Sequence, residues 1–236
     1  MSDTPTDLLV LSLDTTSKHC SISISRNEDI LIEYNFVPKG ELSANLIPAL
    51  EFLLKSVELK LDDIDLFGIA VGPGLFTGIR VGLATLKGLI FNESKPVVPI
   101  VTLEAMAYKY HQNSTKIISL IDARREEVYL GGYEFAGDSF ESFLSPRLVH
   151  FTEIESALDP SLRYRFVGSG AMLYKAYLKE RFQNAGILQR SNFLASEICK
   201  LASIRYRENQ FLSDLKELNP LYVRKPDAET NFQEKK

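Results

Sequence analysis

The sequence has little of what metal centres and disulfide frameworks require. Only two cysteines occur among the 236 residues, Cys20 and Cys199, and they form no CxxC pair. The sequence therefore predicts neither a disulfide framework nor a zinc knuckle. The three histidines, His19, His111 and His150, never fall three or four residues apart. That is the spacing at which a helix presents two metal ligands, so we expect no metal site.

Long apolar runs and an excess of basic residues are missing too. The longest apolar region, residues 66–91, is interrupted by Arg80 and Lys87 and does not predict a membrane span. Residues 1–7 are polar and acidic, unlike a secretory signal, so we expect a cytoplasmic protein. With 27 Lys and Arg against 31 Asp and Glu, the formal charge is −4. This charge disfavours nucleic-acid binding as the main role, because such binding needs clustered basic residues.

No motif for a nucleophile or a phosphate site is complete. The GxSxG elbow of serine hydrolases is absent, and the Gly-Ser-Gly of residues 168–170 is out of its frame. Residues 72–78 (GPGLFTG) lack the Lys-Ser/Thr ending of a P-loop, and Thr77 replaces the third glycine of a dinucleotide fingerprint. A helix N-terminus after this stretch would favour an anion. We nevertheless favour tight strand-to-helix turns for both stretches, and the missing nucleophile disfavours a peptidase.

One pattern occurs twice along the chain: a strand, an aspartate, a turn and a second strand. Predicted strands at 8–13 and 20–25 flank Asp14, and strands at 117–121 and 128–135 flank Asp122. The repetition indicates a duplicated α/β fold with two lobes. Coincidence is the alternative, because strand-Asp-turn is common chemistry.

Further strands and helices are predicted from the spacing of apolar residues. The helix that begins near Ser43 contains Pro48, which must lie in the first turn or kink the helix, because proline lacks the donor N–H. The predicted strands are 30–36, 65–71 and 164–167, and the predicted helices are 43–57, 77–91 and 193–206.

The helix over 77–91 has two unusual properties. Gly74, Gly78 and Gly82 recur every four residues on one stripe, which predicts the close approach of another backbone. This helix and the preceding one are also apolar on more than one face. They are either buried within their own lobe or offer a surface to a partner, and we favour the partner surface slightly.

Four segments resemble motifs of one known family, in the right order along the chain. Residues 13–17 (LDTTS) are similar to its opening I-D-T-[AST]. Residues 72–82 (GPGLFTGIRVG) resemble its signature G-P-G-[SL]-F-T-G-[LVI]-R-[IV]-G. Residues 122–129 (DARREEVY) match D-A-R-x-x-E-V-Y, and residues 220–224 (PLYVR) are similar to P-x-Y-[LV]-R. The family is TsaB, also called YeaZ. One departure is Leu42, where members commonly have a histidine.

The resemblance implies an actin-like (ASKHA, ribonuclease H-like) fold of two α/β lobes. We expect the first lobe over residues 1–104, carrying helices that dock onto a partner. The second lobe is expected over 105–223, and a polar tail over 224–236.

The resemblance also implies a role in making N6-threonylcarbamoyladenosine at position 37 of tRNAs that decode ANN codons. A TsaB-like chain would be a non-catalytic scaffold that dimerises with the transferase TsaD and supports turnover by the ATPase TsaE. It would reach tRNA through that complex, and homodimers would use similar surfaces. We expect no cofactor, and whether ATP or ADP binds at the partner interface, the one place considered for it, stays open. The alternative is an actin-like ATPase or small-molecule kinase that grips phosphates through both hairpin aspartates.

Particular residues follow from these expectations. The side chains predicted to dock onto the partner are Leu46, Leu50, Leu53, Ile79, Val81 and Leu86. The predicted contacts to phosphate or tRNA are Asp14, Thr15, Asp122 and Arg124, at the two hairpins.

Overall fold

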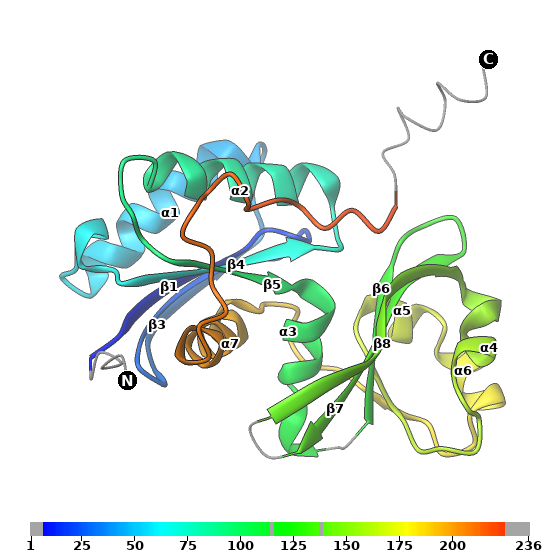
Figure 1. Ribbon diagram of the computed structural model, residues 1–236. Coiled ribbons are helices and arrows are strands. Elements are labelled where there is room, and N and C mark those ends of the chain that lie inside the picture. The colour runs from blue at the N-terminus through cyan, green and yellow to red at the C-terminus, as the bar shows by residue number, and fades with distance from the viewer. Residues whose placement is uncertain (1–6, 114–115, 137–138, 225–236) are drawn as a thin grey trace. The chain divides into compact units, whose positions relative to one another are not determined.

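One arrangement of five strands occurs twice in the computed structural model, which describes residues 7–113, 116–136 and 139–224 (Figure 1). The first sheet has the order β3-β2-β1-β4-β5. Its first three strands form an antiparallel meander, and β4 and β5 continue it in parallel. The strands are β1 (Leu9–Asp14), β2 (Cys20–Arg26), β3 (Asp29–Phe36), β4 (Leu66–Gly72) and β5 (Val97–Val101).

The second sheet repeats this order. Read from β8, it runs β8-β7-β6-β9-β10, with an antiparallel meander followed by two parallel strands. Its strands are β6 (Lys116–Asp122), β7 (Glu127–Ala136), β8 (Ser139–His150), β9 (Arg165–Val167) and β10 (Gly186–Leu188). The predicted duplication is confirmed, because β1 and β6 hold the same place in their sheets and both end in an aspartate.

The chain divides into two compact units, one around each sheet. Unit 1 comprises Met1–Ala105 and Asn192–Pro220, and unit 2 comprises Met106–Ser191 and Leu221–Lys236. The first lobe was expected to end at residue 104, and the first segment of unit 1 ends at Ala105. The assignment of 192–220 to the second lobe was wrong. Of the predicted tail, residue 224 belongs to unit 2, and 225–236 lie outside the described residues.

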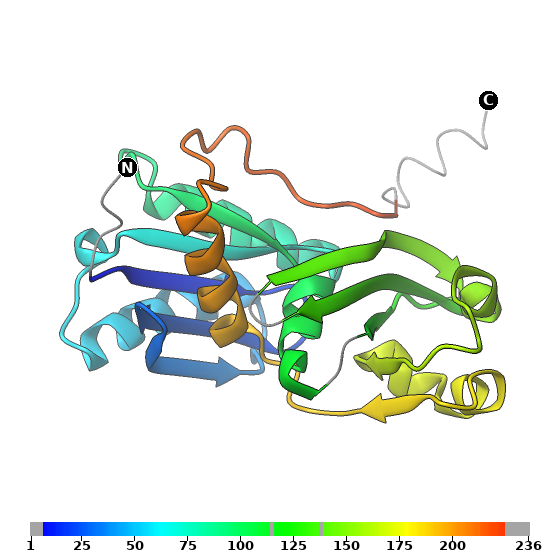
Figure 2. The same ribbon diagram turned by 60° about the horizontal axis from the view of Figure 1, so that its bottom comes forward.

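In unit 1, helices cover both faces of the sheet. Figures 1 and 2 show α1 (Leu42–Ser56) and α2 (Phe76–Leu89) on one face and α7 (Ala195–Arg207) on the other. The strands β1 and β4 are therefore buried on both faces, which explains their nearly continuous apolar sequence. A 3-10 turn, Leu61–Asp63, precedes β4, and α3 (Thr102–Tyr108) follows β5.

The helix α7 belongs to unit 1 because its apolar side is buried on that sheet. Ile198, Leu201 and Ala202 are fully buried. Two strand serines hold its start: Ser12 Oγ donates to the carbonyl of Ala195 at 2.6 Å, and Ser21 Oγ accepts the N–H of Ala195 at 3.0 Å. The helix was predicted, but its distant partner could not be deduced from its own periodicity.

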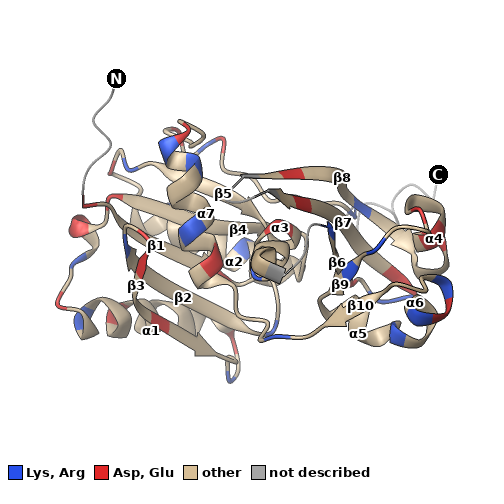
Figure 3. Cartoon of the chain, turned by 90° about the horizontal axis from the view of Figure 1, so that it is seen from below, with Lys and Arg blue, Asp and Glu red and all other residues tan. Residues whose placement is uncertain are grey.

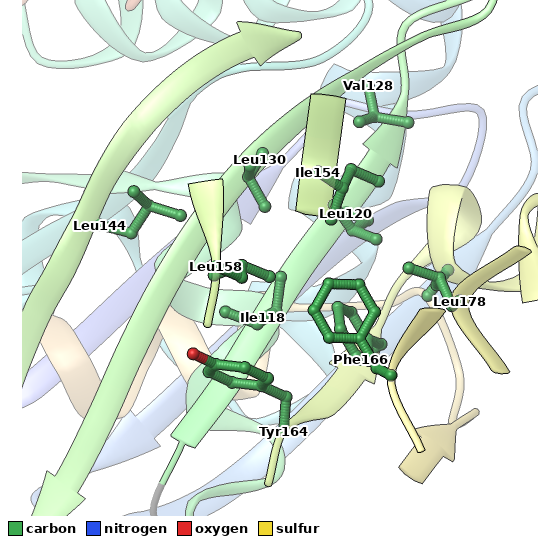
Figure 4. Close-up of a cluster of buried hydrophobic side chains, with 12 residues drawn as sticks. Ile118, Leu120, Val128, Leu130, Leu144, Ile154, Leu158, Tyr164, Phe166 and Leu178 are labelled. Carbon is green, nitrogen blue, oxygen red and sulfur yellow. The ribbon is translucent and has the colours of Figure 1, made fainter. Parts of the chain in front are cut away.

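Unit 2 packs short helices against one face of its sheet. They are α4 (Ile154–Ala157), α5 (Ser169–Leu173) and α6 (Lys175–Arg181), with a 3-10 turn at Phe151–Glu153. A second 3-10 turn, His111–Asn113, precedes β6. Figure 4 shows the core between these helices and the sheet, where Leu120 and Phe166 from the strands meet Leu178 from α6. The ring centres of Phe166 and Phe182 lie 5.2 Å apart in this cluster.

Two further expectations concern the helices. Pro48 lies inside α1 and beyond its first turn, so it cannot donate a hydrogen bond to the carbonyl of Ala44. Across the described part of the chain, no helix is both long and apolar enough to span a membrane.

Candidate functional site

The stripe of glycines before and within α2 brings this helix into close contact with another backbone. A Cβ added to Gly74 would lie 2.2 Å from the carbonyl oxygen of Thr16, and one added to Gly78 would lie 2.0 Å from that of Thr15. A Cβ at Gly82 would lie 2.2 Å from Thr15 Oγ1. The predicted close approach is confirmed, and the approaching backbone is the turn between β1 and β2.

Hydrogen bonds fix this contact. Thr15 Oγ1 donates to the carbonyl of Gly78 at 2.8 Å, and the N–H of Leu75 donates to the carbonyl of Thr16 at 2.6 Å. The helix α2 therefore covers the first hairpin turn, which is hydrogen-bonded to α2 and to the residue before it through Thr15 and Thr16.

The prediction that Asp14 and Thr15 contact phosphate or tRNA is wrong for the molecule as folded. Both side chains are buried, each with 1% of its surface exposed. Asp14 Oδ1 accepts hydrogen bonds from the N–H of Thr16 at 2.9 Å and from its hydroxyl at 2.7 Å. The carboxylate thus organises its own turn, and the α2 contact explains why a ligand cannot reach Thr15.

Most of the predicted docking residues are buried in unit 1 itself. Leu46, Leu50, Leu53, Ile79 and Leu86 are all at most 3% exposed. They cannot serve as exposed anchors, because they form the inner stripes by which α1 and α2 cover the sheet. Only Val81 of the predicted set is partly exposed.

The outward stripes of the two helices carry a second set of apolar side chains. Phe52 is 57% exposed, Leu75 45% and Ile47 38%. We call this set the α1–α2 face: Ala44, Ile47, Pro48 and Phe52 in or next to α1, and Leu75, Val81 and Ala84 in or next to α2. The guanidinium of Arg80 beside it lies 3.8 Å from the ring centre of Phe76. An apolar outer surface on helices that are already buried on their inner side is typical of a protein–protein interface.

The second hairpin turn is built differently from the first. Asp122 and Arg124 are exposed, as their predicted contact role requires. Asp122 Oδ1 accepts the N–H of Arg124 at 2.8 Å, and the N–H of Asp122 donates to Ser169 Oγ at 3.0 Å. The Gly-Ser-Gly turn at 168–170 therefore supports the hairpin, which agrees with its interpretation as a tight structural turn.

Arg224 was not among the residues predicted to lie at the second hairpin turn, yet it contacts this turn. One Nη donates to the carbonyl of Ala123 at 2.9 Å, and the other pairs with Glu127. The end of the described chain thus clamps the second hairpin turn about 100 residues upstream. The Arg of the PLYVR segment was a signal that could have indicated a tether, but nothing in the sequence named its partner.

The two cysteines are buried thiols. Burial, together with the nearby Asp14 carboxylate, raises the pKa of Cys20 to about 12, and burial also raises the pKa of Cys199. Both therefore remain thiols rather than nucleophilic thiolates near neutral pH. Within the described ranges, His, Cys, Asp and Glu form no group of three that could hold a metal ion.

Comparison with known proteins places the chain in a family. A family model described as TsaD, tRNA N6-adenosine threonylcarbamoyltransferase, matches residues 37–232. The chain belongs to this family. Among curated relatives, the tRNA threonylcarbamoyladenosine biosynthesis protein TsaB of Haemophilus influenzae is 29% identical, over 92% of this chain and 94% of its own. TsaB of Bacillus subtilis is 24% identical, over 95% and 98%. The resemblance to TsaB is confirmed.

Solved structures agree on the fold. YeaZ from Pseudomonas aeruginosa superposes with a TM-score of 0.77 and 23% identity, over 91% of this chain and 99% of that one. A second protein from that organism, with similarity to peptidase YeaZ, gives 0.79 and 22% over 92% and 100%. With the repeated strand order, this likeness confirms the predicted α/β fold of two similar lobes.

The glycine stripe gives a direct test of the α2 contact. Gly78→Ala should reduce the free energy of unfolding by about 3 kcal/mol, because the new methyl group would overlap the Thr15 carbonyl. Gly88→Ala, on the same helix with no atom within 4 Å of its added Cβ, is the control. It should leave stability unchanged or raise it by up to about 1 kcal/mol. Urea unfolding measures both, and equal effects of the two changes would contradict the contact.

Proposed function

We propose that this chain is a non-catalytic scaffold and activator subunit in tRNA threonylcarbamoyladenosine biosynthesis. It would dimerise with a TsaD-like transferase and support turnover that depends on a TsaE-like ATPase. The TsaB names of its relatives support the pathway. The α1–α2 face supports a role that depends on docking.

The observation that carries the non-catalytic proposal is the burial of the first hairpin turn. An actin-like ATPase or kinase would need both hairpin aspartates to hold phosphates through Mg²⁺. Asp14 is 1% exposed and is bonded to Thr16, and α2 seals the adjacent Thr15. Of the two aspartates, only Asp122 is exposed. This asymmetry favours a scaffold over an enzyme of the actin-like kind.

The α1–α2 face is the docking surface in this proposal. Its core would be Ile47, Val81 and Ala84, flanked by the more exposed Phe52 and Leu75. Small and apolar groups at the centre allow helices of a partner to approach closely, and a buried apolar centre usually dominates the binding energy. Without the transferase, a second copy of this chain would use the same face.

Ala84→Arg tests the docking surface without disturbing the core, because Ala84 is exposed on α2. A long cation at the centre of an apolar interface should weaken the heterodimer by at least about 100-fold, since its charge would be desolvated without a partner. Isothermal titration calorimetry with the cognate transferase measures the change. The matched control is Ala176→Arg, at an exposed position of α6, which should bind like the wild type. Undiminished binding by the Ala84 variant would refute this placement of the interface.

The function itself is tested by reconstitution. The assay contains this chain, the transferase, the ATPase, threonylcarbamoyl-adenylate, ATP and an ANN-decoding tRNA, and each protein is omitted in turn. Modified adenosine should form with the full set and fall to background without this chain, while this chain alone should form none. Equal product in its absence would contradict the proposal. ATP hydrolysis by the isolated chain would instead favour the actin-like enzyme.

A further inference from the structure

Three consecutive residues of the second hairpin turn adopt a left-handed backbone, and none of them is glycine. The φ angles are 62° at Arg124, 54° at Arg125 and 61° at Glu126. Each costs roughly 1–2 kcal/mol in a residue with a Cβ, whereas glycine adopts this conformation freely. A turn needed only for its shape would be more stable with glycine or asparagine. The reason for these residues therefore lies in their side chains.

Backbone hydrogen bonds hold the turn in this conformation. The N–H of Ala123 donates to the carbonyl of Glu127 at 2.9 Å, and the N–H of Glu127 donates to that of Arg124 at 3.0 Å. The N–H of Phe151 donates to the carbonyl of Glu126 at 2.8 Å. Strained backbone persists where its surroundings over-determine it, and such places are frequently functional.

The clamp by Arg224 adds a side-chain constraint from a distant part of unit 2. Its two Nη atoms bond to Ala123 and Glu127, the residues on either side of the left-handed stretch. Arg224 therefore fixes both ends of the turn.

The acidic groups of the turn are engaged within unit 2. Asp122 accepts from the N–H of Arg124, Glu127 pairs with Arg224, and Glu126 Oε2 lies 3.7 Å from His150 Nε2. The guanidinium of Arg124, by contrast, is exposed and makes no hydrogen bond or ion pair with the residues that the structure describes. The turn thus presents an arginine whose donors are available to a ligand.

The charge of unit 2 matches an anionic ligand. Its described residues include twelve Lys and Arg against nine Asp and Glu, whereas those of unit 1 include twelve against seventeen. Figure 3 shows Lys and Arg on and around α6 and beside β6 and β9. The negative formal charge of the whole chain hides this difference between the units.

We propose that the turn 123–127 contacts the phosphate backbone of the tRNA through Arg124, with Arg224 as a positioning residue. This inference rests on the proposed function, in which a tRNA is the substrate of the assembled complex. A guanidinium binds phosphate oxygens through two parallel donors, and a rigid turn reduces the entropy lost on binding. An acidic protein surface is the other ligand that this chemistry could fit, and the test separates the two.

Arg124→Gly distinguishes the effect of the side chain from that of the backbone strain. Glycine removes the positive charge and, at the same time, adopts the left-handed conformation without strain. The variant should be at least as stable as the wild type in urea unfolding. It should nevertheless weaken binding of a fluorescent ANN-decoding tRNA to the complex with the transferase by about 10-fold, the effect of one charge-assisted hydrogen bond. The slope of log K against log salt concentration should become shallower by about 1.

Lys200→Ala, an exposed lysine on α7 of unit 1, controls for the loss of one positive charge and should bind tRNA like the wild type. If Arg124→Gly leaves tRNA affinity and salt slope unchanged in an intact complex, the inference is wrong. If Arg124→Gly weakens assembly with the transferase but leaves tRNA affinity unchanged, the ligand of Arg124 is a protein. That outcome contradicts the proposed RNA contact. A wild-type complex that fails to form or to modify tRNA would contradict the proposed function instead.

The positioning role of Arg224 is tested by a double-mutant cycle. Arg224→Ala should weaken tRNA binding when Arg124 is present and have little further effect in the Arg124→Gly background. Arg224→Lys, which can keep one donor and the charge beside Glu127, should restore part of the binding. If the Arg224→Ala variant does not fold, Arg224→Lys takes its place in the cycle. Additive losses in the cycle would show that Arg224 does not act through Arg124.

Discussion

The close approach of α2 to the backbone of Thr15 and Thr16 determines the properties of unit 1. Three glycines are needed for it. A methyl group at Gly74 or Gly78 would lie within 2.2 Å of a carbonyl oxygen, and one at Gly82 would lie 2.2 Å from Thr15 Oγ1. Once α2 is seated there, its inner side chains must cover β4 and α1 must complete the layer beside it. The same contact seals the first hairpin turn, so the aspartate that could have faced a phosphate becomes a structural residue.

The two units share one strand order but differ at the turn after the first strand. In unit 1 the turn after the first strand is covered by a helix, and apolar side chains lie on the outer surface of that helix. In unit 2 the corresponding turn is exposed, charged and clamped by Arg224. We interpret the first arrangement as one that docks a protein and the second as one that contacts the nucleic acid on which the complex acts.

Much of the fold could be predicted from local patterns. The alternation of Ile22 and Ile24 with serines predicted β2, and the four-residue spacing of Gly74, Gly78 and Gly82 predicted the close contact of α2. Five of the six predicted docking residues were wrong for a physical reason. A helix that is apolar on two faces does not reveal which face covers its own sheet, so Leu46 and Leu50 were taken for interface anchors although they are core residues.

Long-range contacts were the part that the sequence could not supply. The return of α7 to unit 1 depends on Ser12 and Ser21, more than 170 residues upstream, and the clamp by Arg224 depends on a carbonyl 101 residues away. The backbone strain at Arg124 was equally hidden, because arginine is not a residue that predicts a left-handed turn. The contacts of α7 and of Arg224 join segments that carry no pairing signal of their own.

Hydrogen–deuterium exchange of the full chain, alone and with the cognate transferase, tests most directly whether the α1–α2 face is the docking surface. Amides in 42–56 and 76–89 should become more protected on binding, while those of α7 should exchange as before. Protection confined to other segments, with α1 and α2 unchanged in a complex that has formed, would contradict this placement.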